Sequence, residues 1–353
     1  MRESDGAVAE VVAFPRLPQS DGSAAVLCGL GTWLPPKVVP NDEIAARLDT
    51  SDEWIRARTG IRQRHVVEPG TATSDLAVEA GLRALKSADT DQVDALVLAT
   101  TTPDRPCPAT APDVAHRIGL DRVAAFDVNA VCTGFLYGMA SAAGLIAAGV
   151  AERVLVIGAD TFSTITDPDC RSTAAIFGDG AGAVVLRAGS PHELGALGPF
   201  DLGSDGADAD LIMVPAGGSR QRSTRRPAAP GAEFFTMAGK AVFRKAIFQM
   251  AGSAQSVLQK AGLRLRDIDK FVIHQANARI LNGVADMLGQ PTGKFVRNIE
   301  QVGNTAAASV PLALTSACES GELRAGQRVL LGAFGGGLTW GSTVLRWPDI
   351  EIL

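Results

Sequence analysis

Three residues whose side chains could together carry out acyl-group chemistry lie far apart in this sequence, each near the end of a predicted element. Cys132 stands where the apolar run 123–128 gives way to an Ala- and Gly-rich segment without charged residues before Glu152. His274 ends a second apolar run, and Asn304 lies in the stretch VGNTAAAS. At a helix start, a thiol faces free N–H groups that favour the thiolate, so Cys132 is a candidate nucleophile with His274 and Asn304 as polar partners.

Each of these residues also has a purely structural explanation. A free cysteine is often a small buried hydrophobe. His274 could be a hydrogen-bonded core residue, and Asn304 could cap the helix that follows it. The glycine triplet 335–337 could be no more than a turn. The residue types alone therefore leave both explanations open.

The long uncharged segment around Cys132 raises a separate question, because about 18 consecutive apolar residues can cross a membrane as a helix. Asn129, Ser141 and several glycines interrupt the segment, and acidic residues flank it. A helix that is apolar on all sides is also what the centre of a large soluble protein requires. We therefore expect a buried central helix and no association with a membrane.

Composition and charge are those of an ordinary globular protein. The 353 residues are 46% hydrophobic and 20% charged with a formal net charge of −5, enough for two domains or one double domain and without a basic field for nucleic acid. The five cysteines have neither CxxC nor zinc spacing, so no metal is expected. Their odd number, without a recognisable signal peptide, indicates the reducing cytoplasm. Residues 1–23 are interpreted as a mobile N-terminal extension.

The elements that must position the candidate residues alternate between apolar strands and helices. Asn41 and the two acidic residues after it can cap a helix at 44–48, and Ser74 a helix at 75–88. The Arg-rich stretch 51–65 is either a solvated basic loop or a site for an anionic ligand. The remaining predictions are strands at 24–34, 93–100, 153–159, 269–274 and 328–332, a strand pair at 177–189, helices at 113–119, 243–260, 276–288 and 305–319, and irregular segments at 101–112 and 199–232.

The sequence also repeats itself. Val93 and Ile268 begin similar apolar runs 175 positions apart (268 − 93), and Val154 and Val329 have the same separation (329 − 154). This predicts two similar α/β halves, and the nearly continuous apolar strands favour mostly parallel sheets covered on both faces. On this mapping His274 corresponds to Ala99, so both lie at the C-terminal ends of strands, where reactive groups of α/β folds collect.

Several stretches resemble one known family in the family's own order. They are SDEWIRARTGIRQRH (51–65), AVCTGF (130–135), FGDGAGA (177–183), HQANARI (274–280), GNTAAASVP (303–311) and AFGGGLTWGS (333–342). From about Ala24 to Trp347 the chain resembles β-ketoacyl-acyl-carrier-protein synthase III, of the thiolase fold. The resemblance implies an α/β fold with five layers, αβαβα, and two duplicated halves, here 24–196 and 197–353. It also implies a homodimer.

The resemblance carries catalytic roles onto residues of this chain. Cys132 matches the nucleophile that takes a primer acyl group from acyl-CoA, and His274 and Asn304 match the pair that binds the malonyl thioester carbonyl and promotes decarboxylation. Loss of CO₂ leaves an enolate, which fixed hydrogen-bond donors stabilise. The N–H groups of Cys132 and Gly336 would form an oxyanion hole. No metal or other cofactor is implied.

Substrate-binding roles follow from the same resemblance. Trp54 and Arg171 match positions that hold the adenine of CoA, since a flat base stacks well on such side chains. Arg58 matches a neighbouring basic position. Asn277 matches a supporting hydrogen-bonding partner and is counted with the CoA-binding set.

Two departures from the family pattern concern the primer and the carrier protein. Cys107 stands in the proline-rich loop where many members carry a bulky Phe, so it is the candidate primer-pocket residue. A Lys pair often used for carrier-protein docking is replaced by Asp286 and Met287, although Arg244 and Arg279 keep basic charge nearby and are the candidate docking residues. The 101–112 loop most resembles priming synthases of aromatic polyketide pathways.

Together these features predict a condensing enzyme that loads an acyl group from acyl-CoA onto Cys132 and condenses it with malonyl-acyl carrier protein, priming polyketide synthesis. Fatty-acid initiation with acetyl-CoA is the alternative within the family. Acyl transfer to an alcohol or amine needs no decarboxylation pair, and a hydroxymethylglutaryl-CoA-synthase-like reaction needs an acidic base that the sequence does not reveal near the cysteine. A non-catalytic synthase partner would lack Cys132, and a papain-like hydrolase has a different local sequence.

Overall fold

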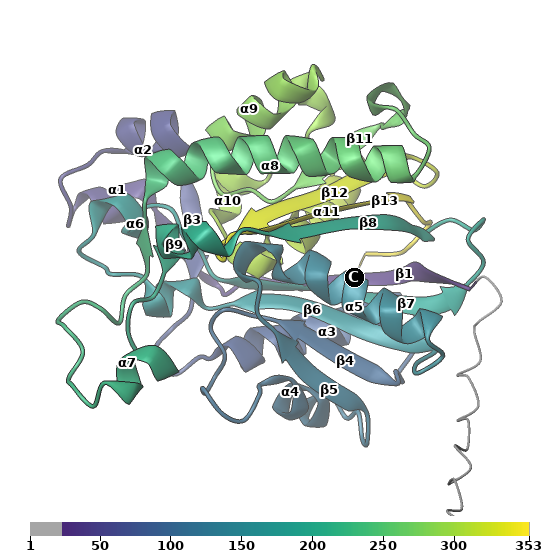
Figure 1. Cartoon of the computed structure of the whole chain (residues 1–353), viewed down its shortest axis with the longest axis horizontal. Coiled ribbons are helices and arrows are strands. Elements are labelled where there is room, and N and C mark those ends of the chain that lie inside the picture. Colours follow the sequence, from purple (N-terminus) through teal and green to yellow (C-terminus); the bar gives the residue numbers. More distant parts are fainter. Residues whose placement is uncertain (1–22, 353) are drawn as a thin grey trace, which may run out of the picture.

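The computed structural model describes residues 23–352, so the extension predicted over residues 1–23 lies, apart from Ser23, outside the described part. Two large sheets dominate the fold, in the strand orders β1-β7-β6-β4-β5 and β11-β12-β13-β8 (Figure 1). The strands are β1 (Ala24–Trp33), β2 (Lys37–Pro40), β3 (Gln63–Val66), β4 (Ala95–Ala99), β5 (Ala124–Val128), β6 (Arg153–Asp160), β7 (Gly180–Gly189), β8 (Leu197–Ser204), β9 (Ile212–Met213), β10 (Thr236–Met237), β11 (Lys270–Ile273), β12 (Arg328–Gly335) and β13 (Thr339–Arg346). The α-helices are α1 (Asn41–Ala45), α2 (Asp52–Thr59), α3 (Thr73–Ser87), α4 (Ala111–Arg117), α5 (Gly134–Ala147), α6 (Arg171–Ala174), α7 (Ser219–Ser223), α8 (Gly239–Lys260), α9 (Ala278–Leu288), α10 (Ile299–Val302) and α11 (Ser309–Glu319). Short 3₁₀ turns are η1 (Val131–Thr133), η2 (Phe162–Ile165), η3 (Gly206–Leu211), η4 (Leu265–Asp267), η5 (Thr292–Lys294) and η6 (Ala306–Ala308).

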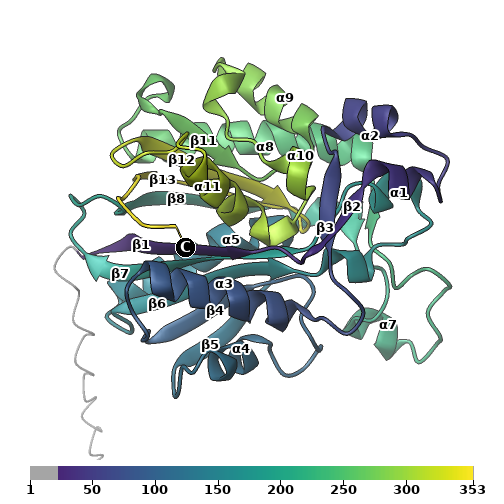
Figure 2. The same ribbon diagram turned by 180° about the vertical axis from the view of Figure 1, so that it is seen from behind.

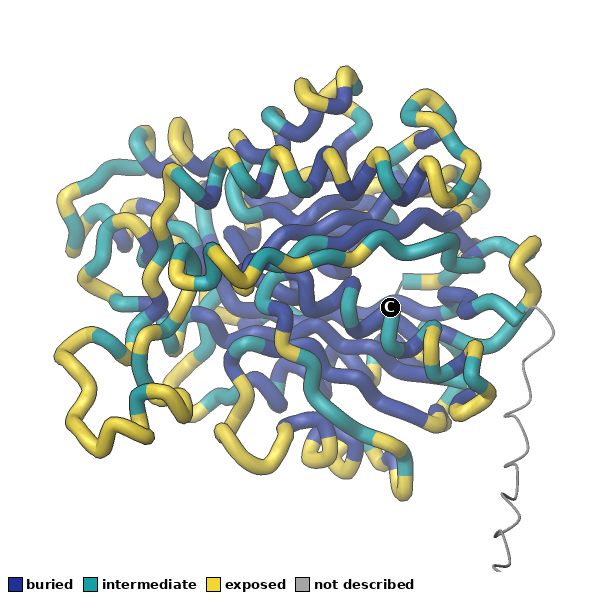
Figure 3. Tube along the Cα trace, viewed as in Figure 1, coloured by how far each residue is buried: buried dark blue, intermediate teal, exposed yellow. Residues whose placement is uncertain are grey.

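The elements stack in five layers, as the resemblance implied. Helices α3 and α4 cover the outer face of the first sheet, and α8 and α9 cover the outer face of the second (Figure 2). Helices α5 and α11 lie between the sheets and contact both. One apolar cluster joins this middle layer to both sheets, with Val97 and Val156 from the first sheet and Val272 and Leu331 from the second. Strands β4, β6, β11 and β12 are accordingly almost fully buried, whereas the edge strands β5 and β8 are only partly covered (Figure 3).

The internal repeat is present in the register of the parallel strands. In the first sheet Ala95 of β4 lies opposite Val154 of β6, and in the second Lys270 of β11 lies opposite Val329 of β12. Both equivalent pairs are separated by 175 positions (270 − 95 and 329 − 154). The duplication expected from the sequence is therefore confirmed at the level of individual residues.

The expectation of mostly parallel sheets is wrong, because both sheets are mixed. Only β4–β5, β4–β6 and β11–β12 are parallel pairs within the large sheets of the described residues. Strand β13 follows β12 after a short glycine turn and therefore pairs with it antiparallel. Strands β7 and β1 pair in the same antiparallel way at the other sheet's edge.

Several local predictions need correction. The Arg-rich stretch forms α2 and β3 rather than a loop; the Ser51 hydroxyl accepts the Trp54 N–H at 3.2 Å to begin the helix. Residues 180–189 form one strand, not a pair, and the region predicted as irregular begins with strand β8, which completes the edge of the second sheet. Asn41 and Ser74 lie inside the first turns of α1 and α3 instead of capping them.

The uncharged segment after Asp127 forms the short turn η1 and the helix α5, which ends at Ala147. Within residues 23–352, no helix combines the length and apolar character needed to span a membrane.

Candidate active site

The three candidate catalytic residues meet at one small cavity, although they come from different parts of the chain. Cys132 lies in η1 before α5, His274 directly follows β11, and Asn304 lies between α10 and η6. All three line a cavity of about 40 Å³. The structure therefore brings together the side chains that the sequence singled out.

The other walls of this cavity are almost entirely apolar. Phe162, Phe177 and Phe235 pack against one another in its wall, with ring centroids 4.1 to 5.1 Å apart. Ile212 comes from the region 199–232 that was predicted to be irregular, and Phe235 comes from the stretch after it, to which no element was assigned, so sequence reasoning missed both residues. Apolar walls exclude water and strengthen every hydrogen bond made to a substrate inside.

The backbone around Cys132 is held by the turn between β12 and β13. Val131, just before the cysteine, has φ +49°, which is unfavourable for a β-branched residue. A Cβ on Gly335 would lie 2.8 Å from the Cys132 nitrogen, so only glycine permits this close approach. Gly336, the predicted second oxyanion-hole residue, lines the same cavity. The glycine triplet is thus more than a turn, because it packs directly on the backbone of the candidate nucleophile.

Burial determines the charge state of Cys132 and His274. It raises the pKa of the Cys132 thiol far above its ordinary value, and the nearby Asp160 carboxylate raises it further. The prediction that the helix start favours the thiolate is therefore wrong for the resting protein, because desolvation outweighs the helix N–H groups. Burial also lowers the pKa of His274 to about 3. The site rests as a neutral thiol beside a neutral imidazole, whose buried Nδ1 has no hydrogen-bond partner among the described residues.

Hydrogen bonds fix the loops that carry Asn304 and His274. The Oδ1 of Asn304 accepts the Ala306 N–H at 3.0 Å, which leaves the amide Nδ2 as a donor. Gln275, fully buried beside His274, accepts the Ile299 N–H at 3.0 Å through its Oε1. Gln275 lies within the HQAN motif but was not among the candidate residues predicted from the sequence.

An acidic group does lie near Cys132, contrary to what the sequence suggested. Asp160, the last residue of β6, is fully buried, and burial raises its pKa to about 6. Both carboxylate oxygens already accept hydrogen bonds from backbone N–H groups. Asp160 is therefore poorly placed to act as a general base toward a substrate.

A wider cleft of about 320 Å³ leads from the surface toward the cavity. Trp54, Arg58 and Arg171 line it, with the guanidinium carbons of Arg171 and Arg58 at 4.2 and 5.5 Å from the Trp54 ring centroid. Asn304 lines both spaces, so the cleft and the cavity adjoin each other at this residue. The arrangement suits a long substrate whose flat, anionic end stays outside while its reactive end reaches Cys132.

Asn277 lies at the same cleft and has a structural role. Its Nδ2 donates to the Arg58 carbonyl at 3.0 Å, and its Oδ1 accepts the Arg279 N–H at 2.8 Å. Asn277 thereby caps α9 and joins it to the end of α2. Thr59 and Ser172 also line the cleft and were not singled out from the sequence.

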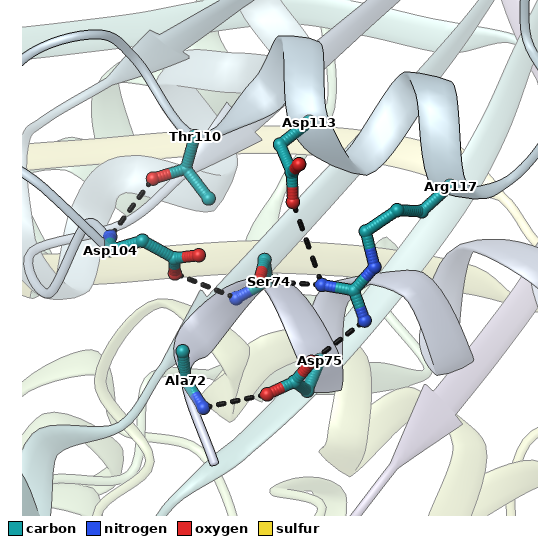
Figure 4. A network of polar contacts seen from close by, with 7 residues as sticks. All are labelled: Ala72, Ser74, Asp75, Asp104, Thr110, Asp113 and Arg117. Atoms are coloured by element: carbon teal, nitrogen blue, oxygen red, sulfur yellow. Dashed lines mark hydrogen bonds and ion pairs between the residues drawn. The ribbon is translucent and has the colours of Figure 1, made fainter. Parts of the chain in front are cut away.

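Cys107 is exposed and lines neither the cavity nor the cleft of its own chain. Polar contacts anchor the base of its loop (Figure 4). Asp104 accepts the Ser74 N–H at 3.0 Å and donates its own N–H to the Thr110 hydroxyl at 3.0 Å. Arg117 binds Asp75 and Asp113 beside them.

The candidate docking residues are exposed on neighbouring helices. Arg244 lies on α8 and Arg279 on α9, where its guanidinium lies 5.7 Å from the Phe243 ring centroid. Asp286 and Met287 are also exposed, farther along α9. Between residues 23 and 352, no cluster of three or more His, Cys, Asp or Glu side chains could hold a metal ion.

Comparison with known proteins gives the site its context. Residues 126–206 match the family described as 3-oxoacyl-[acyl-carrier-protein (ACP)] synthase III, and residues 258–347 match its C-terminal part. The chain is 60% identical over 330 residues to β-ketoacyl-[acyl-carrier-protein] synthase III 5 of Streptomyces coelicolor. The aligned region covers 94% of this chain and 99% of the relative. The chain belongs to the β-ketoacyl-acyl-carrier-protein synthase III family. It is accordingly an acyltransferase of the condensing type.

Solved structures of synthase III proteins agree with this assignment. The 3-oxoacyl-(acyl carrier protein) synthase III of Pseudomonas aeruginosa PAO1 is 53% identical, covers 93% of this chain and 99% of its own, and superposes with a TM-score of 0.87. The priming β-ketosynthase of the R1128 polyketide pathway is 33% identical, covers 96% of this chain and 100% of its own, and has a TM-score of 0.88. The thiolase-like fold is therefore confirmed, and synthase III membership implies acyl-CoA and malonyl-acyl carrier protein as substrates.

Proposed function

We propose that this synthase primes polyketide synthesis by loading an acyl group larger than acetyl onto Cys132 and condensing it with malonyl-acyl carrier protein. The observation that carries the condensing reaction is the shared cavity of Cys132, His274 and Asn304, which adjoins the cleft in which Arg171 stacks on Trp54.

In the first half-reaction the Cys132 sulfur attacks the acyl-CoA carbonyl, and CoA leaves as its thiol with the proton that Cys132 gives up. The thiol is neutral at rest, so this proton has to move as the carbon–sulfur bond forms. The departing CoA thiolate is the acceptor of this proton, since an imidazole with a pKa of about 3 is a much weaker base. The Cys132 and Gly336 N–H groups would stabilise the negative oxygen of the tetrahedral intermediate.

In the second half-reaction the malonyl thioester carbonyl binds between His274 and Asn304. Loss of CO₂ leaves an enolate, whose oxygen receives hydrogen bonds from the His274 ring and the Asn304 Nδ2. The enolate carbon attacks the acyl-Cys132 carbonyl, the new carbon–carbon bond forms, and the Cys132 thiolate leaves and is reprotonated. A neutral His274 ring suits this role, because its N–H group can donate a hydrogen bond to the enolate oxygen although the ring carries no charge.

A large groove beside the cavity supports a primer longer than acetyl. This groove, of about 740 Å³, shares Val131, Ile212 and Phe235 with the Cys132 cavity and extends along Pro103 and Pro106 of the proline-rich loop. The likeness to the R1128 priming ketosynthase points the same way. Fatty-acid initiation stays the second candidate, because the Streptomyces and Pseudomonas relatives carry the general synthase III name.

Intact-mass measurement after incubation with acyl-CoAs from acetyl to hexanoyl tests this function. The chain should gain the mass of one acyl group, fastest with a primer longer than acetyl, and Cys132→Ala should gain none. Acylation of the Cys132→Ala chain would place the nucleophile elsewhere, and a preference for acetyl would favour fatty-acid initiation.

We also propose a homodimer in the cytoplasm, in which the Cys107 loop of one subunit borders the partner's acyl pocket. Exposure of Cys107 and its absence from the cavity of its own chain fit that arrangement. Light scattering of the purified chain tests it, and a monomer at the concentration of the activity assay would overturn it.

A further inference from the structure

Asp160 is a buried carboxylate that the reaction described above does not use. Its Oδ1 accepts the N–H groups of Thr101 at 2.7 Å and Thr102 at 3.2 Å, and the hydroxyls of Thr100 and Thr102, each at 3.2 Å. Its Oδ2 accepts the Ala307 N–H at 3.0 Å. All these donors are uncharged, so the carboxylate is held by hydrogen bonds and not by an ion pair.

The Oδ2 contact supports the turn that presents Asn304. Ala307 lies in η6, and Ala306 before it has φ +45°, a conformation that is unfavourable for any residue with a Cβ. The N–H of this same Ala306 holds the Asn304 Oδ1. A Cβ on Gly158 would lie 2.5 Å from the Ala307 carbonyl oxygen, so the turn also packs tightly on β6.

The Oδ1 contacts reach the other wall of the site. Thr100–Thr102 open the proline-rich loop, and the Thr102 hydroxyl also accepts the Thr161 N–H at 2.9 Å. Thr101 and Thr102 line the large groove beside the Cys132 cavity. The Asp160 carboxylate thus joins the start of the proline-rich loop to the turn that follows Asn304.

We infer that Asp160 is a positioning residue, whose anionic carboxylate braces the strained Ala306–Ala307 turn and so aims the Asn304 amide at the malonyl carbonyl. A charge-assisted hydrogen bond is about twice as strong as a neutral one, which suits it to hold a strained turn. The inference rests on the decarboxylation role proposed above for Asn304.

Asp160→Asn tests the inference with little change in shape. The asparagine can keep an acceptor toward the threonines, but its NH₂ group then faces the Ala307 N–H, donor against donor. Release of CO₂ from malonyl-pantetheine should fall about tenfold or more. Acyl loading of Cys132 should be unchanged or faster, because loss of a nearby negative charge favours the thiolate.

Rescue separates positioning from general loosening. In the Asp160→Asn background, Ala306→Gly should restore much of the CO₂ release, because glycine adopts φ +45° without strain and needs no brace. A loosened fold would instead lose further activity with the added glycine. Asp127→Asn is the matched control: its carboxylate also accepts two backbone N–H groups, those of Thr110 and Ala111, but it holds no residue of the Asn304 turn. This control should affect both half-reactions alike.

If Asp160→Asn does not fold, the inference is tested by the pH dependence of CO₂ release by the Cys132→Ala chain. Protonation of Asp160, with a pKa of about 6, should lower CO₂ release as the pH falls below 6. His274, after β11, stays neutral in this range with a pKa of about 3, and Cys132 is absent from this chain. Burial also raises the pKa of Asp179, before β7, so the same profile with Asp179→Asn separates the two carboxylates. A flat profile, or wild-type CO₂ release by Asp160→Asn, would overturn the inference. Failure of the wild-type chain to release CO₂ would instead overturn the proposed function.

Discussion

Asn304 and Gly178, from different halves of the chain, are joined through their backbones. The Gly178 N–H donates to the Asn304 carbonyl at 3.0 Å, and the Asn304 N–H donates to the Ile176 carbonyl at 3.0 Å. The FGDG segment thus holds the Asn304 backbone from the side of the first sheet, while Ala306 holds its side chain. Because these two backbone hydrogen bonds do not involve the side chain, the Asn304 backbone should keep its place when the side chain is removed.

The hydrogen-bond donors His274 and Asn304 should matter more for decarboxylation than for acylation. Asn304→Ala and His274→Ala each remove one donor to the enolate, which typically costs on the order of 100- to 1000-fold in rate. Radiolabelled CO₂ release from malonyl carrier protein should fall by this factor, whereas intact mass should still show acyl-Cys132. Equal loss of both half-reactions would contradict this division of labour.

Replacement of His274 by Asn should make stability less sensitive to acid. The folded pKa of about 3 lies below the ordinary 6.5, so between these values the unfolded chain binds the additional proton. The free energy of unfolding therefore falls with pH below 6.5, by up to about 1.4 kcal/mol per pH unit from this one group. Asp160 acts in the opposite direction between 3.8 and about 6, but it is common to both chains. Urea unfolding at pH 7.5 and 5.5 should show a smaller loss for His274→Asn, and an identical loss would exclude His274 as the cause.

The stacked Arg171 should contribute to recognition of the nucleotide end of CoA. Its guanidinium carbon lies 4.2 Å from the Trp54 ring centroid, a geometry that the flexible ammonium of lysine does not reproduce. Arg171→Lys should raise the KM for acyl-CoA roughly tenfold, from about 1 to 2 kcal/mol of stacking. Acyl-pantetheine, which lacks the nucleotide, is the control and should keep its KM. An equal increase for both substrates would place the effect elsewhere.

The basic pair on α8 and α9 should attract an acidic carrier protein. Charge reversal by Arg279→Glu should raise the KM for malonyl carrier protein several-fold at low salt and leave acyl-CoA loading unchanged, because exposed charges mainly steer association. The difference from wild type should shrink as salt screens the charges. Arg266→Glu, exposed on η4 outside the cleft, is the matched control. A KM that responds equally to both changes would argue against a local docking surface.

Cys107 should set the upper size of the primer. In the proposed homodimer, a Phe at this position would fill space in the partner's acyl pocket that Cys leaves open. Each buried methylene of a longer primer contributes up to about 0.8 kcal/mol, roughly fourfold in affinity. Across an acyl-CoA series, wild-type kcat/KM should rise from acetyl toward propionyl to hexanoyl, and Cys107→Phe should shift the preference toward acetyl. An unchanged order in the variant would show that Cys107 does not select the primer.

The sequence predicted the fold well where apolar runs were long and the repeat constrained them. Strands β4, β6, β11 and β12 and their 175-residue offset followed directly from the apolar pattern. Pattern alone could not predict β8, because this edge strand is only half covered and carries two glycines and a proline, residues typical of loops. The pattern also failed to predict α2, because this helix lies in the Arg-rich stretch 51–65. It begins at a Ser cap and ends at a glycine with φ +81°.

For the site, sequence identified the groups that could react but not their environment. Cys132, His274 and Asn304 carry recognisable chemistry and lie in distinctive motifs, and the structure brings them together. The charge state of Cys132 depends on burial and on Asp160, which is distant in sequence and visible only in three dimensions. The same holds for Phe235, whose segment has no periodic pattern.

The walls of the Cys132 cavity come partly from the duplicated sheets and partly from one connecting segment. Cys132 and His274 stand at strand ends of the duplicated sheets, whereas Ile212 and Phe235 come from the largely exposed segment between β8 and α8 (Figure 3). Exposed connecting segments accept insertions and substitutions that a close-packed core does not. Synthases of this kind could therefore evolve to use a new starter unit through substitutions in this one connecting segment. The residues that form the carbon–carbon bond would stay unchanged.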